Sequence, residues 1–390
     1  GVALAALISM PLLSGCSSDE PDRNNSIFGS ETDVLDPDSY TYAFDCWIRD
    51  NYLKVYNCEF RYQMQHIGTD MSYNLVPATL DKAEDLALLT KYLWFDVYGK
   101  LVGEDFLKQY GPKILHLIGS PAYNPVNHTE ILGLAEGGLK VSLFKVNELD
   151  VNNTSLLNEH YFKTMHHEFA HILHQTKTYP REFDLINTVN YEPNNWQDRN
   201  GAIVNSLGFS TTYASSQSRE DFAETCANYI TRTYEQWDLM LWIAARGWET
   251  TFNDEYAYAY YYYATPSDRE NDNRTYVGLY ISPEANNGLF GIAETTAKTG
   301  SAPGGYSKIH TTVEGVEEYI KRMQQQYELV PVADADLNDG KANIEQKVSI
   351  ARNWFKDAWG LDIDELRDEV QHRQSSIPMD SLRNQVNQYK

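Results

Sequence analysis

The chain has 390 residues, 42% of them hydrophobic, and a formal net charge of −23 from 32 basic and 55 acidic residues. Nucleic-acid binding needs a concentrated basic surface, so this balance disfavours that class of partner and favours a soluble, exposed protein. The length allows one large domain, alone or with an appendage.

The amino terminus predicts membrane attachment through lipid. The first 13 residues are apolar or small and uncharged, and Leu13-Ser14-Gly15-Cys16 follows them. This pattern is typical of a bacterial lipoprotein signal, which is cleaved before a cysteine that becomes diacylated, here Cys16. A charged n-region is missing, so we expect the printed sequence to begin inside the signal peptide, to which we assign residues 1–15. The apolar run is too short to span a membrane, and a buried helix is the alternative.

Residues 16–39 predict a flexible tether. They are rich in Ser, Asp, Glu, Pro and Asn and show no periodic apolar face. Asp19 and Glu20, soon after the lipidated cysteine, resemble surface-export signals. We therefore expect a lipid-anchored protein of the bacterial outer membrane, exposed at the surface.

The next part of the chain alternates helical and extended patterns. Residues 78–110 repeat apolar side chains at helical spacing, residues 113–118 and 139–146 read as strands, and residues 154–177 return to helical spacing. The cysteines after the tether contain no CxxC zinc motif. Whether Cys46 and Cys58 form a disulfide or stay free thiols is open at this point.

Residues 167–171 read His-Glu-Phe-Ala-His, an HExxH motif. On a helix, the spacing of four residues puts His167 and His171 on one face, one turn apart, where their imidazoles can share a metal ion. Glu168 lies beside that face, close enough to hold a water on the metal. Random order would produce roughly 0.02 such motifs in a chain of this composition. The motif therefore predicts a zinc hydrolase; the alternative is a surface helix whose histidines happen to be four apart.

Other side chains of the same predicted helix bear on the prediction of a zinc site. The side of the helix opposite the two histidines is apolar and predicts a core face, with Phe162, Met165, Phe169, Ile172 and Leu173. His174 lies on the histidine face but about 10 Å from His167 along the axis, so we interpret it as a cleft residue or a satisfied polar group. His166 points off that face and has no predicted role.

A catalytic zinc takes three protein ligands and leaves one position for water. The pattern HExxHxxGxxH is excluded, because His174 and Lys177 stand at its Gly and last His positions. A second helix can supply a Glu instead.

Residues 218–230 predict that second helix. Ser218 and Asp221 form a predicted capping box, and Glu220 and Glu224 lie four residues apart on the face away from the apolar stripe. The two carboxylates suit a metal ligand and a partner for a ligand histidine. Two solvated acids favoured by the helix dipole fit equally well.

The rest of the chain contains no internal repeat. We expect the second helix to continue over residues 220–248. Residues 254–287 contain clustered tyrosines on a predicted loop, where they either stack against sugars or pack on the domain. Helices are predicted over 313–328 and 341–370, the latter with a break at Gly360.

Residues 167–224 resemble the gluzincins of the anthrax lethal factor type. Those proteins carry a Tyr, a ligand Glu seven residues later and a further Glu four residues beyond, and this chain has Tyr213, Glu220 and Glu224 at that spacing. The resemblance implies that Glu220 is the third zinc ligand, that Glu224 supports a ligand histidine and that Tyr213 donates to the developing oxyanion. One departure is Ala170, where the lethal factor has Gly; both are small, so the helix packing should survive.

A wider resemblance takes in the lipoprotein signal, the Gly-rich segment 132–138, the HExxH motif and the helix with the two glutamates. These features are similar to those of the substrate import-associated zinc metallohydrolase lipoproteins. That family implies a place in nutrient uptake, beside a TonB-dependent importer and its binding lipoprotein as partners.

These observations predict an α+β fold: a gluzincin-type zinc peptidase domain over residues 40–335, with a small mixed sheet beside the HExxH helix, and a C-terminal helical segment over 336–390 packed on it. We expect a surface-tethered enzyme that hydrolyses peptide bonds of extracellular protein or glycoprotein. There are two alternatives. One is a non-catalytic peptide- or glycan-binding lipoprotein of an import system that retains a relic zinc site. The other is a zinc hydrolase that acts on a non-peptide amide.

The expected cofactor is Zn²⁺ held by His167, His171 and Glu220. Glu168 is expected to act as general base toward water and to pass the proton to the leaving amine. Tyr213 is expected to donate a hydrogen bond to the oxyanion.

Overall fold

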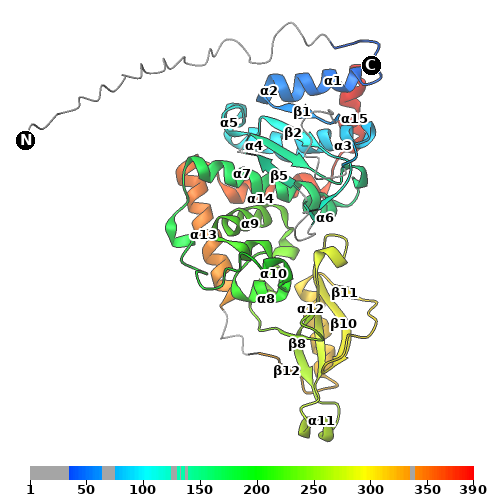
Figure 1. Cartoon of the computed structure of the whole chain (residues 1–390), viewed down its shortest axis with the longest axis vertical. Helices are drawn as coiled ribbons and strands as arrows, with labels where there is room; N and C mark the ends of the chain where they lie inside the picture. Colours follow the sequence, from blue (N-terminus) through cyan, green and yellow to red (C-terminus); the bar gives the residue numbers. More distant parts are fainter. Residues whose placement is uncertain (1–34, 64–74, 124–129, 132, 137–138, 334–338) are drawn as a thin grey trace, which may run out of the picture.

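Three layers follow one another along the long axis of the molecule (Figure 1): a mixed sheet with its helices, a bundle of helices, and an antiparallel sheet. The computed structural model describes residues 35–63, 75–123, 130–131, 133–136, 139–333 and 339–390. The predicted signal peptide, Cys16 and most of the tether lie outside the described residues, as do Leu132, Gly137 and Gly138 of the Gly-rich segment.

The first layer contains a four-stranded sheet with the order β1-β2-β6-β5. Its strands are β1 (Glu59–Arg61), β2 (Ile114–Leu117), β5 (Gly133–Glu136) and β6 (Lys140–Leu143). β1, β2 and β6 are parallel, and β5 runs antiparallel to β6 at the edge, where it contacts α7 (Lys163–Thr176). A separate two-stranded ladder joins β3 (Ala122–Tyr123) and β4 (Glu130–Ile131). The predicted small mixed sheet is therefore present, and both predicted strands are neighbours in it.

Helices surround this sheet, and those that fall within residues 78–110 confirm the helical spacing predicted there. They are α1 (Tyr42–Ile48), α2 (Lys54–Tyr56), α3 (Leu80–Thr90), α4 (Asp96–Val102) and α5 (Glu104–Tyr110), with π-helical turns η1 (Arg49–Leu53) and η2 (Lys91–Phe95). The run breaks at Gly103, whose φ of 87° is a conformation that favours glycine. Cys46 and Cys58 are separate, buried free thiols.

The second layer is built around the predicted HExxH helix. Its elements are α6 (Thr154–Leu157), η4 (Asn158–Phe162), α7, α8 (Gly201–Leu207), α9 (Ser218–Thr231), α10 (Tyr234–Ala244), α13 (Gly340–Trp359) and α14 (Ile363–Ser375). α6, η4 and α7 follow without a gap, which confirms the helix predicted over 154–177. The predicted core face is confirmed for Phe162, Met165, Phe169 and Leu173, which are buried. Ile172, the fifth residue of that predicted face, is half-buried and lines the cavity of the second layer.

The single helix expected over 220–248 is wrong, because the chain breaks between α9 and α10. Arg232 leaves helical geometry with φ −68° and ψ 138°. Thr233 then starts a new helix through a capping box with Gln236, in which each side chain bonds the other residue's backbone N–H. The apolar stripe continues across this break, so hydrophobic spacing alone could not locate it.

The third layer is an antiparallel sheet of six strands, which the sequence analysis did not predict. They are β7 (Glu249–Thr251), β8 (Tyr256–Tyr262), β9 (Thr275–Ile281), β10 (Gly291–Lys298), β11 (Ile309–His310) and β12 (Val330–Pro331), in the order β11-β10-β9-β8-β12 with β7 also on β8. α11 (Pro266–Glu270) lies at its tip and α12 (Val313–Gln324) beside it (Figure 1). The tyrosine-rich segment is thus not a loop: Tyr258, Tyr262 and Tyr276 are buried strand residues, because tyrosine suits a pleated, half-buried surface.

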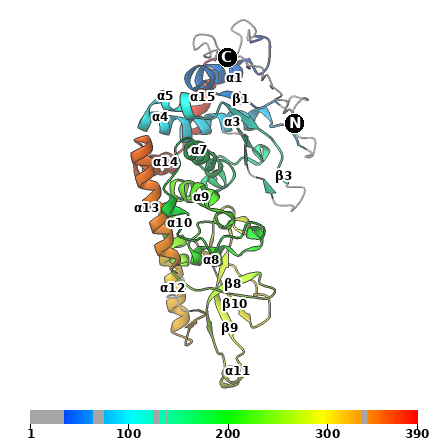
Figure 2. The same ribbon diagram turned by 60° about the vertical axis from the view of Figure 1, so that its left-hand side comes forward.

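The C-terminal helices connect the layers. α12 matches the helix predicted over 313–328, and α13 and α14 match 341–370 with its break at Gly360, which has φ 64°. α13 extends along the molecule between α14 and α12 (Figure 2). α15 (Met379–Asn387) packs against α1 and α3, so the end of the chain returns to the first layer.

Short 3-10 turns complete the described elements: η3 (Val146–Glu148), η5 (Arg181–Phe183), η6 (Trp196–Asp198), η7 (Tyr213–Ser216) and η8 (Pro283–Ala285). A search of the described helices for one both long and apolar enough to cross a membrane finds none.

Candidate metal centre

Helices α7 and α9 pack against each other and bring three potential metal ligands together. Nε2 of His167 lies 3.1 Å from Oε2 of Glu220 and 3.0 Å from Nε2 of His171. Nε2 of His171 lies 3.0 Å from the same oxygen. In the described part of the chain, this is the one group of three or more His, Cys, Asp or Glu side chains with metal-ligand spacing.

The spacing of these three atoms fits a zinc ion. In a tetrahedral site with bonds of about 2.0 to 2.1 Å, ligand atoms lie about 3.3 Å apart, close to the distances found here. A single proton can join only one pair of the three atoms, whereas a divalent cation interacts with all three lone pairs. The donor set of two imidazoles and one carboxylate is also one that zinc accepts in catalytic sites.

The electrostatics of the cluster favour a bound positive charge. Burial opposes charge on His167, but its hydrogen bonds with Glu220 and Glu224 outweigh that effect and raise its pKa to about 10. Burial would raise the pKa of Glu220, yet its bonds with His167 and His171 hold that pKa well below the ordinary value. Two carboxylates thus stay ionised around the imidazoles.

Each ligand histidine is oriented by a partner on its other ring nitrogen. Nδ1 of His167 lies 2.8 Å from Oε1 of Glu224, and the other oxygen of Glu224 accepts a bond of 2.6 Å from the Thr211 hydroxyl. Nδ1 of His171 lies 2.8 Å from Nε2 of His174. Such partners set the tautomer that directs Nε2 at a metal.

His174 is therefore a satisfied polar group, and it also lines the cavity, so both interpretations that its spacing allowed hold. Its specific partner was missed, although the i, i+3 spacing from His171 was the signal for it. Burial, followed by the nearby charge of His171, lowers the pKa of His174 to about 4. A neutral His174 can accept the Nδ1–H of His171. His166 is a core residue bonded to Tyr98, 2.9 Å from its hydroxyl.

Glu168 and Tyr213 lie beside the two histidines of the candidate metal centre. Glu168 is half-buried and lines the cavity beside the histidines. Burial, against the nearby histidines, raises the pKa of Glu168. The ring of Tyr213 stacks on His167 at 5.8 Å between centroids, and Trp196 packs its edge against that ring at 4.8 Å. Tyr213 comes from η7, just before α9.

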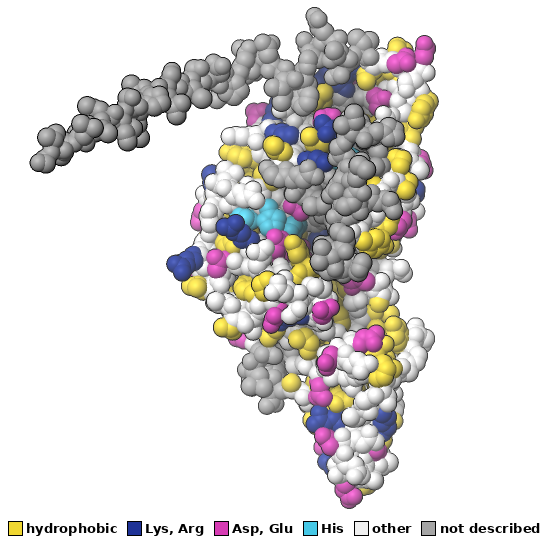
Figure 3. Space-filling view, viewed as in Figure 1, with side chains coloured by type: hydrophobic (Ala, Val, Ile, Leu, Met, Phe, Trp, Pro, Cys, Tyr) yellow, Lys and Arg dark blue, Asp and Glu magenta, His cyan; other side chains and the backbone are white. Residues whose placement is uncertain are grey.

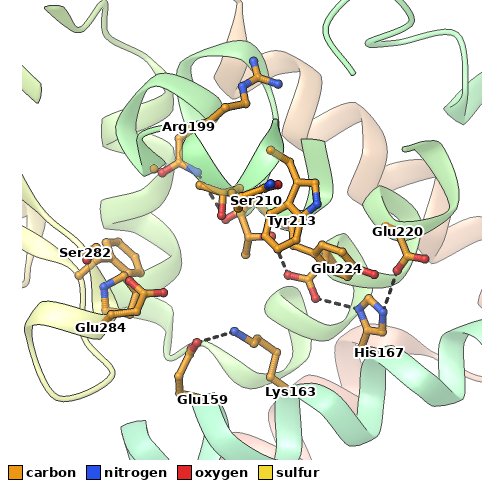
Figure 4. A pocket seen from close by; sticks show the side chains of 18 of the residues that line it. Glu159, Lys163, His167, Arg199, Ser210, Tyr213, Glu220, Glu224, Ser282 and Glu284 are labelled. Carbon is orange, nitrogen blue, oxygen red and sulfur yellow. Dashed lines mark hydrogen bonds and ion pairs between the residues drawn. The ribbon is translucent and has the colours of Figure 1, made fainter. Parts of the chain in front are cut away.

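A cavity of about 1150 Å³ opens over these side chains. Figure 4 shows Glu159 and Lys163 on the same side as His167, with Ser282 and Glu284 of the third layer across the space. Figure 3 shows histidine side chains gathered at one spot on this face of the molecule. The volume exceeds the roughly 300 to 1,000 Å³ of most small-ligand pockets, so the cavity can hold several residues of a polymer.

The start of α9 is held by a buried ion pair that the sequence analysis missed. The predicted capping box is wrong: α9 begins without a side-chain cap. Asp221 instead bonds Nζ of Lys347 at 2.7 Å, with both side chains completely buried, and accepts a bond of 2.8 Å from the Tyr191 hydroxyl. Lys347 also donates to the carbonyl of Gly208. A lysine within the apolar stripe of α13 was the available signal.

Comparisons with known proteins agree with this geometry. A family model described as "Putative zinc-binding metallo-peptidase" matches residues 38–364, a range that includes α7 and α9. Among solved structures, the chain is similar to "a putative zinc-binding metallo-peptidase from Bacteroides caccae ATCC 43185", with 29% identity, a TM-score of 0.56, and coverage of 87% of this chain and 95% of that one. No curated protein matches the chain.

Proposed function

The chain belongs to this zinc-binding metallo-peptidase family, and we propose that it is a zinc-dependent metallopeptidase of the gluzincin type. The observation that carries the proposal is the convergence of His167, His171 and Glu220 within 3.0 to 3.1 Å of one another at the floor of a large cavity. Glu168 and Tyr213 flank the three atoms from separate elements.

His167, His171 and Glu220 would hold the zinc ion. Zinc bound there supplies Lewis acidity for attack on a carbonyl group. Glu224 and His174 keep the two imidazoles in the tautomer and orientation that present Nε2.

Glu168 acts on the water that attacks the peptide carbonyl carbon. It accepts one proton as the new C–O bond forms and gives that proton to the nitrogen as the C–N bond breaks. The products are a carboxylate and an amine. The raised pKa of Glu168 suits a group that both accepts and returns a proton.

Tyr213 stabilises the negative charge that develops on the carbonyl oxygen. Burial, reinforced by the nearby carboxylates, raises the pKa of its phenol, so the hydroxyl remains a donor. Its ring is held between His167 and Trp196, so little reorganisation is needed at the oxyanion stage. A positioned donor of this kind is worth roughly 3 kcal/mol.

We further propose that the protein acts outside the cell, tethered through Cys16 to the outer membrane, on protein or glycoprotein taken up as nutrient. The support is the lipoprotein signal and the family resemblance of the sequence. A TonB-dependent importer and its binding lipoprotein are the proposed partners.

Exchange of Glu168 for Gln separates a peptidase from a binding protein. Glu168→Gln keeps the size of the side chain but cannot accept a proton at neutral pH, so cleavage of a peptide library should fall at least about a hundredfold. Zinc content should stay at one ion per chain, because Glu168 is not a ligand. The control is Glu317→Gln, the same change on the exposed side of α12. If the zinc-loaded wild type cleaves no peptide, while it and Glu168→Gln bind one ligand equally well, the binding-protein alternative replaces this proposal.

A further inference from the structure

One arginine of the cavity carries a charge that no carboxylate neutralises directly. Arg232 follows the last residue of α9 and lines the cavity. Its Nη2 donates to the carbonyl of Ser210 at 3.1 Å, its Nη1 lies against Sδ of Met240, and its plane packs on the Phe290 ring at 4.9 Å. Among the described residues, no carboxylate forms an ion pair with it.

Two other cations of this region each form an ion pair with a carboxylate. Lys163 bonds Glu159 at 2.8 Å, and Lys347 bonds Asp221. Burial lowers the pKa of Arg232, but a guanidinium stays protonated in proteins. An anion that reaches Arg232 therefore meets a cation that has already lost much of its hydration and that the nearby carboxylates of Glu159 and Glu224 attract without forming an ion pair with it.

The floor of the cavity connects Arg232 with the metal centre. Glu220 and Glu224 of α9 line the cavity, as does Arg232 directly after the helix, and Asn228 lies between them in sequence and donates its amide to Glu224. The guanidinium also approaches the centre through Ser210, since the neighbouring Thr211 bonds Glu224, which bonds His167.

The distance between the metal centre and Arg232 suits a substrate longer than one residue. Along a helix that rises 1.5 Å per residue, the Cα atoms of Glu220 and Arg232 lie about 18 Å apart, a distance that about five extended residues cover. The Arg232 guanidinium is directed toward the carbonyl of Ser210. A substrate group that it binds therefore belongs to a residue within about five positions of the hydrolysed bond.

We propose that Arg232 binds a carboxylate of the peptide substrate and makes the protein selective for peptides with an acidic group at that one position. The group is an acidic side chain or the free carboxyl terminus. A guanidinium recognises a carboxylate through charge-assisted, often bidentate hydrogen bonds, and the Phe290 ring excludes water from one side. The inference rests on the proposed function in one respect, that the substrate is a peptide.

The rim of the cavity restricts this selectivity to one position. Asp198, Asp254 and Glu255 line the cavity and are exposed. Their charges are screened by solvent, but they disfavour substrates with many acidic residues. A single carboxylate that reaches Arg232 is therefore preferred over a polyacidic peptide.

The test measures equilibrium binding to zinc-loaded chains that all carry Glu168→Gln, so that a peptidase does not consume the probes. In this test, wild type denotes the chain with Arg232 unchanged in that background. The probes are fluorescent peptide mixtures that are identical except for Glu or Gln at one fixed position, scanned along the peptide, and a matched pair with a free or an amidated carboxyl terminus. Wild type should prefer the carboxylate about tenfold or more in one pair only, the scale of a hydrogen bond to a charged group. The pair that responds identifies which carboxylate is bound.

Arg232→Met should bring that ratio close to one, with the affinity for the uncharged peptide within about twofold, while Arg232→Lys should keep part of the ratio. Arg199→Met is the control, because Arg199 lines the same cavity but Figure 4 shows it directed away from His167. If Arg232 only supports Ser210, both affinities fall together and the ratio persists, which overturns the inference. No measurable binding, or equal affinity at every position, also overturns it.

A cleavage assay on the same mixtures separates the two ideas. Carboxylate preference in binding without any cleavage refutes the peptidase and leaves the role of Arg232 intact. Cleavage of both mixtures with equal kcat/KM and equal affinity keeps the peptidase and refutes the role of Arg232.

Discussion

Replacement of Lys347 by methionine tests how strongly the C-terminal helix α13 holds the ligand helix α9. The ion pair with Asp221 is 2.7 Å long and fully buried, and removal of one member of such a pair costs about 3 to 5 kcal/mol, because the other charge stays buried. Loss of the bond to Gly208 adds about 1 kcal/mol. Methionine nearly matches the apolar stem of lysine, so little cavity forms, and Tyr191 still offsets part of the charge on Asp221.

We therefore expect Lys347→Met to lower the free energy of unfolding by about 4 kcal/mol, measured by urea denaturation with zinc chelated. The matched control is Lys356→Met on the exposed side of the same helix, which should change stability by no more than about 0.5 kcal/mol. Asp221→Asn alone should also destabilise, and the double variant should be about 2 kcal/mol more stable than additivity predicts. A loss below about 1 kcal/mol for Lys347→Met, or additive effects in the cycle, would refute the ion-pair reasoning.

Three further changes address the metal centre and the anchor. Tyr213→Phe should lower kcat about a hundredfold and leave KM nearly unchanged, because the hydroxyl acts at the oxyanion stage; an equal loss through KM alone would contradict that role. His174→Ala should weaken zinc binding about tenfold or more in competition with a chromophoric chelator, and an unchanged affinity would mean that His171 needs no partner. Cys16→Ala should move the protein from the membrane fraction to the soluble fraction with its zinc content unaltered; retention would show that another segment anchors it.

The part of the site that lies within one helix was predictable from the sequence. His167, Glu168 and His171 follow from a local spacing, and the buried Phe162 and Phe169 confirm which side of the helix faces the core. Glu220 could be proposed only through resemblance, since its two-carboxylate helix also fitted a solvated surface. Its contact with the histidines spans 49 and 53 residues of sequence, a separation that no periodicity encodes.

The errors have two physical origins. Hydrophobic spacing carries across a short interruption, so the break at Arg232 was missed even though the capping signal of Thr233 and Gln236 stands in the sequence. Tyrosines fit both a sugar-binding loop and a half-buried strand, and only pairing partners distinguish the two, as when Tyr260 in β8 pairs with Val277 in β9. Local patterns therefore predict elements better than they predict where elements end or pair.

The arrangement of the layers places the proposed metal ligands and the opposite wall of the cavity in different parts of the molecule. α7 is held from behind by the aromatic core of the first layer, where Phe169 packs on Trp94 and Tyr98, and α9 is held by Lys347 of α13. The proposed metal ligands therefore lie on two helices that are each fixed from the side away from the cavity. The wall of the cavity opposite the metal centre comes instead from the third layer. The Phe290 ring of that layer packs on Arg232 where the second and third layers come together. Because the third layer contributes none of the proposed ligands or catalytic side chains, substitutions in its cavity-facing loops should change which peptides bind while the zinc affinity stays the same.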